Sequence, residues 1–403
     1  MKKDSKTKRT KWIRPRHAAV QFVLRILVRV YSFFVYHIRI RRYRDKRQCI
    51  VLLNHVTAFD QFFVSVALGR NVYYVTSEDL FCNGRLSRFL QWSCAPIAIK
   101  KSANDARAVL NCLRVAREGG SIVMAPEGNR TYSGRTGYIK PTVAALCRAL
   151  RLPIFLFRIE GGYGVFPRWS DKARRGRMTA GVSRVIEPEE YLSMSDDELF
   201  ATIRDGLYLD EARDTATFRH KRRAEYLERA IYWCPTCGFS ARMESEGNTF
   251  TCRTCGLSVH YGEDTALSGV GCEAPFRFVA DWYEAQSRAM LAADLSPYRE
   301  TPLFTDTVGL YTTAVFEKRT LLAEEATLSV YDDRFTLSYN GGILTLPFAE
   351  IPAVTVLGRN KMNIYHGGTV YQIKADKRFC ALRYVNTYYR QKEEKEDAEF
   401  LGL

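Results

Sequence analysis

A histidine and an aspartate five positions apart supply the residue types needed for proton transfer. His55 follows the apolar run of residues 50–53, and Asp60 comes five residues after it. A neutral imidazole titrates near neutral pH, so it can take a proton from a hydroxyl group and return it. It works best when a carboxylate bonds its other ring nitrogen and fixes the tautomer. The pair therefore predicts a general base with an orienting carboxylate.

The spacing of this pair constrains the backbone between its members. On one continuous helix, five residues correspond to a rotation of about 140°, so the two side chains would point apart. They meet if His55 ends a strand and Asp60 lies in the first turn of the next helix, where negative charge is favoured. Residues 61–68 have the composition of an apolar helix start. We therefore predict a strand, a turn and a helix, with backbone amides at the helix start as candidate oxyanion donors.

A second motif, PEGNR at residues 126–130, follows another apolar run about seventy residues later. Its arginine, Arg130, offers a cation for an anionic substrate. Taken alone, each motif is also compatible with an ordinary turn or a salt-bridged loop. Their order and their shared position after apolar runs favour a site. A base, its orienting carboxylate and a cation are the groups needed to transfer an acyl group to an alcohol.

These residues resemble the signature blocks of the glycerolipid acyltransferases of the 1-acylglycerol-3-phosphate type. Residues 95–101 are similar to a third block, which ends in a basic residue, and residues 152–154 to a fourth, an apolar strand with an embedded proline. The resemblance covers roughly residues 20–230, with all four blocks in order. Two positions depart from the pattern. Asn129 replaces the usual threonine and Lys101 the usual arginine, and lysine lacks the bidentate fork of a guanidinium.

The resemblance implies the reaction. His55 would deprotonate the acceptor hydroxyl, which attacks the thioester carbonyl of acyl-CoA or of an acyl carrier protein, and Asp60 would hold the reactive tautomer. The expected product is phosphatidate, made from lysophosphatidate in phospholipid synthesis. Acylation of a different lysolipid or alcohol is the alternative within this class. A membrane scaffold with no catalysis is the alternative from another class.

The resemblance also implies the residues that hold the acceptor. Arg130 and Lys101 would bind its phosphate. Glu127 would position the glycerol or the loop itself, and Gly128 belongs to the same substrate-binding loop. A scaffold has no need to keep the catalytic and binding residues together, so their joint presence favours an enzyme.

Positive charge is concentrated at the N-terminus. The net charge is +16, and residues 1–50 hold sixteen Lys or Arg and only two acidic residues. Residues 18–40 are apolar but interrupted by Arg25, Arg29 and Arg39, which leaves at most about nine uncharged residues in a row. A spanning helix needs about eighteen. We therefore predict an amphipathic helix in the interface of an anionic membrane, as a peripheral (monotopic) anchor on the cytoplasmic face. A core helix with a basic outer stripe is the alternative, and no signal peptide is evident.

Most of the eleven cysteines fall into two groups. Those in apolar segments before residue 150 are expected to be buried, reduced thiols of a cytosolic protein. Cys49 lies close to His55 in sequence, although a Cys/His nucleophile pair is the less favoured interpretation. The second group forms two CxxCG repeats with fourteen residues between the inner cysteines, a spacing that predicts a four-thiolate structural zinc site. Its ligands would be Cys234, Cys237, Cys252 and Cys255, with the redox dithiol as the alternative and His260 as a strand residue outside the site.

Zinc ribbons often bind nucleic acid, but this one lacks the charge for it. The loop of residues 239–251 carries Arg242 as its only positive charge, against Glu244 and Glu246. A nucleic-acid binder that used the basic arm and the ribbon would need clustered arginines and aromatic residues here. We therefore expect a spacer or docking module, and no nucleic-acid partner.

The chain changes character after residue 300. Seven short strands are predicted between residues 310 and 374, followed by a helix at about 377–392. This order resembles a pleckstrin-homology-like fold, whose members bind phosphoinositides, lipids or peptides. Arg359 and Lys361 are then candidates for headgroup contact. A structural or protein-binding β domain is equally compatible.

The fold class expected is α/β, with a central mixed sheet flanked by helices, then a small zinc ribbon and a C-terminal antiparallel β domain with a closing helix. The predicted segments are a basic arm with an interfacial helix at 1–45, an acyltransferase domain at 46–195, a connecting helix at 196–232, the ribbon at 233–262, a helical connector at 263–300 and the β domain at 301–403.

Overall fold

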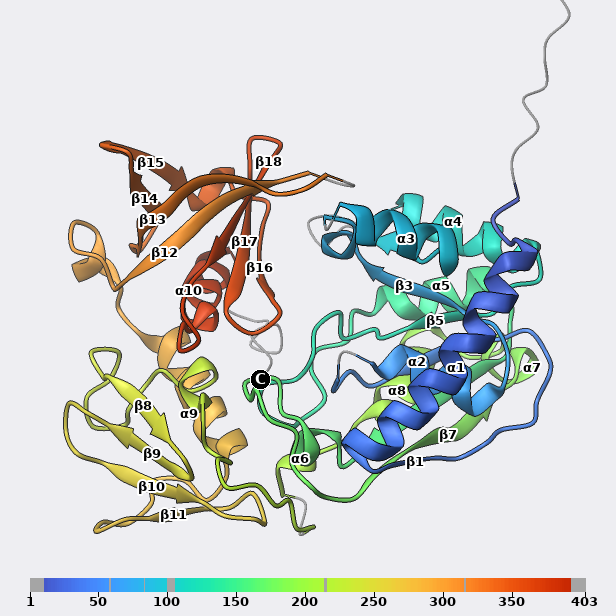
Figure 1. Ribbon diagram of the computed structural model, residues 1–403, viewed down its shortest axis with the longest axis horizontal. Helices are drawn as coiled ribbons and strands as arrows, with labels where there is room; N and C mark the ends of the chain where they lie inside the picture. Colours follow the sequence, from blue (N-terminus) through green and yellow to red (C-terminus); the bar gives the residue numbers. More distant parts are fainter. Residues whose placement is uncertain are drawn as a thin grey trace, which may run out of the picture.

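An α/β lobe occupies the first half of the chain, and two β-rich units follow it (Figure 1). The computed structural model describes residues 11–57, 59–82, 84–99, 106–213, 216–314 and 317–392. The α/β class, the small β unit with four cysteines and the C-terminal antiparallel sheet with its helix agree with the expectation from sequence.

The α/β lobe is built on a seven-stranded sheet in the order β1-β7-β6-β2-β5-β3-β4. β6 and β7 pair antiparallel, and the remaining pairs are parallel. The central strand β2 is buried along its whole length, which its uninterrupted apolar sequence requires. The strands are β1 (Ile38–Ile40), β2 (Ile50–Leu53), β3 (Tyr73–Ser77), β4 (Ile97–Ile99), β5 (Ile122–Met124), β6 (Ile154–Glu160) and β7 (Met178–Ile186).

Helices cover both faces of this sheet and form two separate cores. On one face, α1 and α2 pack on the side of Val51 and Phe155. On the other face, α4, α5 and α8 pack on the side of Ile50 and Leu156. The helices of this lobe are α1 (Pro15–Tyr36), α2 (Asp60–Leu68), α3 (Arg85–Ser93), α4 (Ala106–Arg117), α5 (Thr142–Leu150), α6 (Gly162–Val165), α7 (Pro188–Tyr191) and α8 (Asp196–Leu207), with the 3-10 turn η1 (Glu78–Phe81) before α3.

The prediction of a connecting helix at residues 196–232 is wrong. Helix α8 begins at a capping box formed by Ser195 and Glu198, and it ends at Leu207. Its apolar side packs into the lobe, where Leu199 and Ile203 are fully buried. The chain then continues as loops with the short 3-10 turns η2 (Glu211–Arg213) and η3 (Leu227–Arg229). This segment is rich in charged residues, which are compatible with buried ion pairs and also with an exposed helix. Its composition therefore did not distinguish these two structures.

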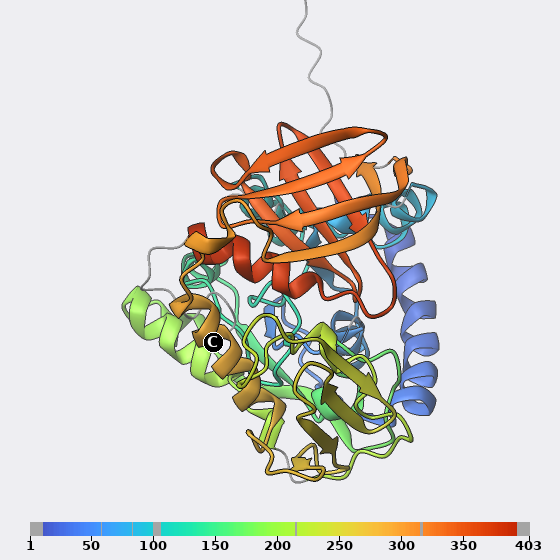
Figure 2. The ribbon, with the colours of Figure 1, turned by 90° about the vertical axis from the view of Figure 1, so that its left-hand side faces the viewer.

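Helix α1 turns its polar side inward. His17, Gln21 and Ser32 are buried, and the Gln21 side chain exchanges two hydrogen bonds with the backbone of Val72, at 3.0 and 3.1 Å. Figure 2 shows α1 along one edge of the molecule. By length and composition, its residues 15–35 are apolar enough to cross a membrane. Its exposed apolar side chains are Phe22, Val23, Ile26, Leu27, Val30, Tyr31, Phe33, Phe34 and Val35.

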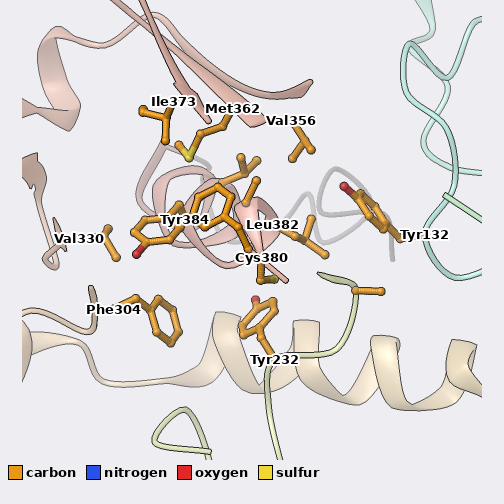
Figure 3. Close-up of a cluster of buried hydrophobic side chains, with 14 of the residues drawn as sticks. Tyr132, Tyr232, Phe304, Val330, Val356, Met362, Ile373, Cys380, Leu382 and Tyr384 are labelled. Carbon is orange, nitrogen blue, oxygen red and sulfur yellow. The ribbon is translucent and has the colours of Figure 1, made fainter. Parts of the chain in front are cut away.

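The two C-terminal units share a core. The first is a four-stranded sheet in the order β11-β10-β9-β8, and the second is a seven-stranded antiparallel sheet covered by α10 (Figure 2). Helix α9 lies between them, and one apolar cluster extends from Phe250 through Trp282 to Tyr384 (Figure 3). The elements are β8 (Met243–Glu246), β9 (Thr249–Cys252), β10 (Ser258–Tyr261), β11 (Leu267–Gly269), α9 (Val279–Ala292), η4 (Ser296–Tyr298), β12 (Phe304–Thr313), β13 (Thr320–Val330), β14 (Arg334–Tyr339), β15 (Gly342–Pro347), η5 (Phe348–Glu350), β16 (Ala353–Leu357), β17 (Lys361–His366), β18 (Thr369–Lys374) and α10 (Ala381–Lys392).

The C-terminal sheet docks on the α/β lobe through a buried carboxylate. Asp79, in η1, accepts hydrogen bonds from Asn363 Nδ2 at 2.7 Å and from the Tyr365 hydroxyl at 2.8 Å. Asp79 and Asn363 are buried, and burial together with the Asp79 charge raises the pKa of Tyr365. Because all three groups are removed from water, each needs the others to satisfy its polar atoms.

We expect Asp79→Ala to destabilise the protein by about 3 kcal/mol or more, because hydrogen bonds to a charged group contribute about 1.5–3 kcal/mol each. Urea unfolding of the full chain measures this loss. Asp205→Ala, which removes an exposed carboxylate, is the control and should leave the unfolding midpoint in place. Equal stability of the Asp79 variant and wild type would contradict the docking role.

Candidate active site and four-cysteine cluster

His55 and Asp60 meet as the strand-turn-helix prediction requires. His55 lies just after β2, and Asp60 is the first residue of α2. The Nδ1 atom of His55 lies 2.9 Å from Oδ2 of Asp60. A carboxylate can only accept, so Nδ1 carries the proton and Nε2 is left as the basic atom. About a quarter of the His55 side chain (24%) is exposed, so the ring can reach a substrate.

The turn between these two residues is organised around the Asp60 carboxylate. Asp60 is fully buried, and it accepts hydrogen bonds from the backbone N–H groups of Val56 and Thr57 and from the Thr57 hydroxyl, at 2.6–2.9 Å. The N–H of Phe59 donates to the Thr57 hydroxyl. These three amides are therefore committed to the turn, and the expectation that amides at this helix start donate to an oxyanion is wrong for them.

Glu127 joins the second motif to the first. Its Oε1 accepts the backbone N–H of His55 at 2.7 Å, and its Oε2 accepts the N–H of Gly137 at 2.7 Å. The carbonyl of His55 in turn accepts the N–H of Thr131 at 3.2 Å. Burial raises the pKa of Glu127 to about 8. Of the two roles expected for Glu127, these contacts are those of a residue that positions the loop.

Two arginines lie together beside this loop. Burial, and then the charge of Arg168, lower the pKa of Arg130 to about 10. Arg168 is buried; it donates to the carbonyl of Arg130 at 2.8 Å and to that of Val356 at 3.3 Å, and it stacks on Tyr132 at 4.2 Å. Within the described residues, neither Arg130 nor Arg168 has a carboxylate within 4.0 Å. Two neighbouring guanidinium groups without an ion-pair partner favour an anion, although the more distant charge of Asp60 offsets part of the Arg130 charge.

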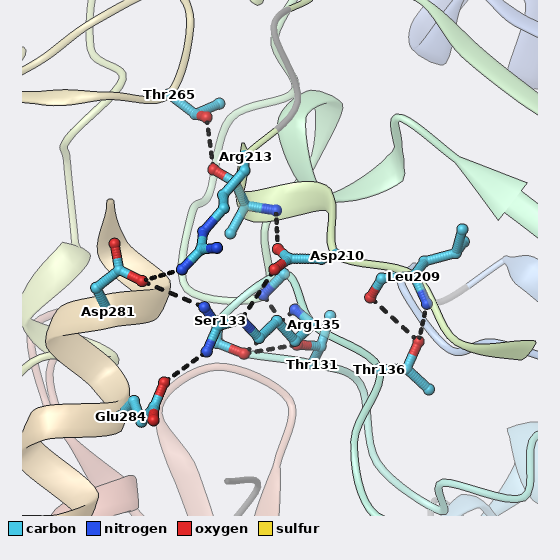
Figure 4. A network of polar contacts seen from close by, with 12 residues as sticks. Thr131, Ser133, Arg135, Thr136, Leu209, Asp210, Arg213, Thr265, Asp281 and Glu284 are labelled. Atoms are coloured by element: carbon cyan, nitrogen blue, oxygen red, sulfur yellow. Dashed lines mark hydrogen bonds and ion pairs between the residues drawn. The ribbon is translucent and has the colours of Figure 1, made fainter. Parts of the chain in front are cut away.

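The segment after Arg130 is held by a second cluster (Figure 4). Arg135 forms ion pairs with Asp210 at 3.1 Å, Asp281 at 3.2 Å and Glu284 at 2.7 Å. Asp281 and Glu284 belong to α9, and Arg213 also pairs with Asp281 at 2.9 Å. The loop of the second motif is therefore fixed from outside the α/β lobe, by the helix that precedes the C-terminal sheet.

The remaining residues expected in the site are placed as follows. Gly128 is exposed and has a φ of +67°, a conformation that glycine adopts without strain, so it forms the turn of the loop. Lys101 lies outside the described residues. Cys49 and His55 lie at opposite ends of β2, about 20 Å apart at 3.3 Å per residue, which excludes them as a nucleophile pair. Arg359 pairs with Asp171 at 3.1 Å, so it contacts the α/β lobe, and the headgroup role considered for it stays a prediction.

Sequence reasoning missed two residues that support the site. Asn54 is buried and exchanges two hydrogen bonds with the backbone of Ile159, at 2.8 and 2.9 Å, which fixes the end of β2 against β6. Its place directly before His55 was the available signal. Arg168 carries no sequence signal, because its partners are two backbone carbonyls that lie 38 and 188 residues away.

The four cysteines form a compact cluster. Their sulfur atoms all lie within 4.8 Å of one another, with Cys234 to Cys255 at 3.7 Å and Cys237 to Cys252 at 3.9 Å. A zinc tetrathiolate with Zn–S bonds of about 2.3 Å has sulfur–sulfur edges of about 3.8 Å, so the dimensions fit. The Leu257 backbone N–H lowers the pKa of Cys255 to about 7, which favours a thiolate. His260 is not part of the cluster.

Comparison with known proteins gives one family match in sequence and likenesses to 17 solved chains. Residues 35–160, about a third of the chain, match the family model described as Acyltransferase. No curated protein matches the chain significantly. The solved structure of the 1-acyl-sn-glycerophosphate (LPA) acyltransferase PlsC from Thermotoga maritima is similar at 16% identity, with a TM-score of 0.40, over 48% of this chain and 80% of that one.

A second solved structure, that of Inner Membrane Complex sub-compartment protein 3 (ISP3) from Toxoplasma gondii, is 16% identical, with a TM-score of 0.18. The match covers 22% of this chain and 77% of that one. At these TM-scores neither structure adds to the sequence match.

Replacing Glu127 tests its role between the two motifs. We expect Glu127→Ala to lower the free energy of unfolding by about 2–4 kcal/mol, because two backbone donors lose their acceptor. Glu127→Gln should lose less, since its amide oxygen keeps one of the two bonds. Urea unfolding measures both changes. Wild-type stability in the Ala variant would contradict the bridging role.

The raised pKa of Glu127 also predicts a dependence on pH. Between its ordinary value of 4.5 and about 8, the folded protein keeps a proton that the unfolded chain has lost. The contribution of Glu127 to stability therefore falls as the pH rises through this window. Wild type should lose stability relative to Glu127→Gln between about pH 5 and pH 8. A difference that stays constant with pH would contradict the shift.

Proposed function

Because residues 35–160 form an acyltransferase domain, we propose that the protein transfers a fatty acyl group from an acyl thioester to the free hydroxyl of lysophosphatidate, giving phosphatidate. The donor is acyl-CoA or an acyl carrier protein. The observation that carries the proposal is the 2.9 Å contact between His55 and a fully buried Asp60. The loop of the second motif lies beside this pair and carries Arg130, which together with Arg168 has no ion-pair partner among the described residues.

The chemistry follows from the free nitrogen of His55. Nε2 takes the proton of the acceptor hydroxyl as the oxygen attacks the thioester carbonyl carbon. The tetrahedral intermediate collapses with cleavage of the carbon–sulfur bond, and the imidazolium returns the proton to the departing thiolate. Asp60 stabilises the imidazolium through Nδ1, and no covalent acyl-enzyme is required.

The acceptor is expected to carry a phosphate. Arg130 has no carboxylate partner within the described residues, and it lies against the buried charge of Arg168. An anion placed there would offset both charges. This favours a lysolipid with an exposed phosphate over a neutral alcohol, and it favours an enzyme over a scaffold.

The membrane location rests on α1. Its outward face is apolar, whereas its inward residues His17 and Gln21 are bonded to the lobe. Because α1 packs on α2 and α3, we place it in the plane of the interface and not across the bilayer. The cytoplasmic face is favoured because the cysteines within the described residues are free thiols.

His55→Ala should lower acyl transfer by about 10²–10⁴-fold or more while leaving the fold intact, because the general base is lost. The assay follows a labelled long-chain acyl-CoA and lysophosphatidate in anionic liposomes, and circular dichroism checks the fold. His260→Ala, in the ribbon sheet, is the matched control and should retain full activity. Turnover by folded His55→Ala would overturn the mechanism. If wild type gives no product, the assay is repeated with a panel of lysolipids and with an acyl carrier protein as donor.

We also propose that the four-cysteine cluster holds one structural zinc ion. Four thiolates would complete its coordination, so it would have no open position for catalysis. Purified protein should contain one zinc per chain by mass spectrometry of the metal. Cys255→Ser should reduce this content and lower the melting temperature, because the ribbon shares its core with the C-terminal sheet. Cys272→Ser, an exposed thiol outside the cluster, is the control; equal zinc content in both variants would refute the site.

A further inference from the structure

A cationic pocket lies at the N-terminal end of α1, apart from the site of His55. Its volume is about 370 Å³. Segments far apart in the sequence line it: the start of α1, helix α3 and helix α4. All its lining residues belong to the described part of the chain, and none is a carboxylate. Its cations are Lys11, Arg14, Arg16, Arg88 and Arg114, and Arg114 pairs with Glu118, outside the lining, at 3.3 Å.

The floor of the pocket carries a buried donor without a partner. His17 is 1% exposed, and its Nε2 atom has no hydrogen-bond partner. Its Nδ1 accepts the backbone N–H of Arg14 at 3.4 Å, so the proton of the neutral ring lies on Nε2. Burial and the charges of Arg16 and Arg14 lower the pKa of His17, which keeps the ring neutral. The pocket lining therefore combines a neutral, buried histidine with several positive charges.

Two tryptophans shape the pocket and hold its cations. Trp12 donates to the carbonyl of Ala95 at 3.0 Å, and Arg114 lies over its ring at 5.7 Å. Arg16 donates to the carbonyl of Trp92 at 2.9 Å and lies 5.2 Å from the centre of that ring. These contacts fix two guanidinium groups before any ligand binds, which lowers the entropic cost of binding an anion.

The pocket lies at the opposite edge of the parallel strands from the active site. Ala95 precedes β4, whereas His55 follows β2. Along α1, His17 and Tyr31 are fourteen residues apart, about 21 Å at 1.5 Å per residue, and Tyr31 contacts Phe59 beside the active-site turn. Helix α1 therefore runs from the pocket at its first turn to the active site near its end.

An apolar surface adjoins the pocket. Helix α3 exposes Leu86, Phe89 and Trp92, and Trp92 is itself a lining residue that is 50% exposed. The exposed apolar face of α1 begins at Phe22, little more than one turn after His17. Cations next to apolar and tryptophan side chains have the arrangement expected at the boundary between lipid headgroups and acyl chains.

We propose that this pocket binds the phosphate-bearing headgroup of an anionic membrane lipid and so holds the first turn of α1 at the membrane surface. The inference rests on the membrane location proposed above for α1. With the headgroup bound at one end of α1 and the active site at the other, the helix lies flat in the interface and both ends face the lipid. A membrane-spanning α1 would instead place the pocket and His55 on opposite sides of the bilayer.

The charge and position of the pocket favour a lipid over the nucleotide part of acyl-CoA. If the nucleotide part of acyl-CoA bound here, the thioester at its other end would have to extend across the α/β lobe to reach His55. A lipid headgroup needs no such path, because the acyl chains continue along the apolar surfaces of α1 and α3. Phosphate recognition by several cations is common to both ligands, so the experiment must separate them.

The test measures binding of the full chain to vesicles of phosphatidylcholine, with and without phosphatidylglycerol, by co-sedimentation. Wild type should bind the anionic vesicles more tightly. Lys11→Glu/Arg88→Glu changes two exposed cations of the pocket and should weaken this binding by about tenfold or more, since each basic residue near the surface contributes about 1 kcal/mol. Lys140→Glu/Arg204→Glu, an equal charge change on exposed residues elsewhere in the lobe, should weaken it much less.

Three results would overturn the proposal. The first is equal loss of binding in the pocket variant and the control variant, which would indicate only general electrostatic attraction. The second is displacement of the protein from anionic vesicles by coenzyme A, with no displacement by an equal concentration of inorganic phosphate, which would assign the pocket to the nucleotide. The third is a pocket variant that binds anionic vesicles as wild type does.

Activity gives a separate readout. On a short-chain acceptor dissolved in detergent, the pocket variant should turn over at the wild-type rate, because the pocket does not touch the reacting groups. If wild type shows no acyl transfer while the vesicle result holds, the proposed reaction fails and the headgroup pocket stands. If transfer holds and the vesicle difference is absent, the pocket assignment fails and the reaction stands.

Discussion

The Glu127 carboxylate is the contact on which the candidate site depends. It accepts the backbone N–H of His55 and that of Gly137, so a single side chain fixes the position of His55 relative to the loop of the second motif. The parallel sheet makes this contact available: β2 and β5 are neighbours, and both motifs leave the sheet at the same edge. Asp60 then needs to orient only the ring of His55, because the backbone beneath the ring is already held.

The C-terminal half of the chain takes part in this arrangement. Arg168 joins the carbonyl of Arg130 to that of Val356 in the C-terminal sheet, and Arg135 joins the same loop to α9. Asp79 adds a third buried connection, to β17. The zinc-type ribbon shares its core with α9 and the sheet, so the cysteine cluster stabilises elements that contact the loop. The appended units therefore contribute to the geometry of the site, whatever ligands they bind on their own account.

Helix α1 links the cationic pocket to the candidate site. The outer face of α1 is apolar, whereas His17 and Gln21 on its inner side are buried. Its length places the cationic pocket at one end and the active-site turn at the other. This arrangement is the basis of the interfacial location proposed above for α1.

The sequence by itself determined the pair His55 and Asp60, the four cysteines and the seven successive strands of the C-terminal sheet, because these depend on local spacing and on alternation of apolar residues. It failed at residues 196–232, where buried ion pairs and a charged helix have the same composition. Only the tertiary structure decided that Arg168 supports the loop, that Arg359 faces Asp171 and that α1 is apolar on its outer side. Each of these depends on partners distant in the chain, and which face of a helix is covered is fixed by packing, not by the helix's own residues.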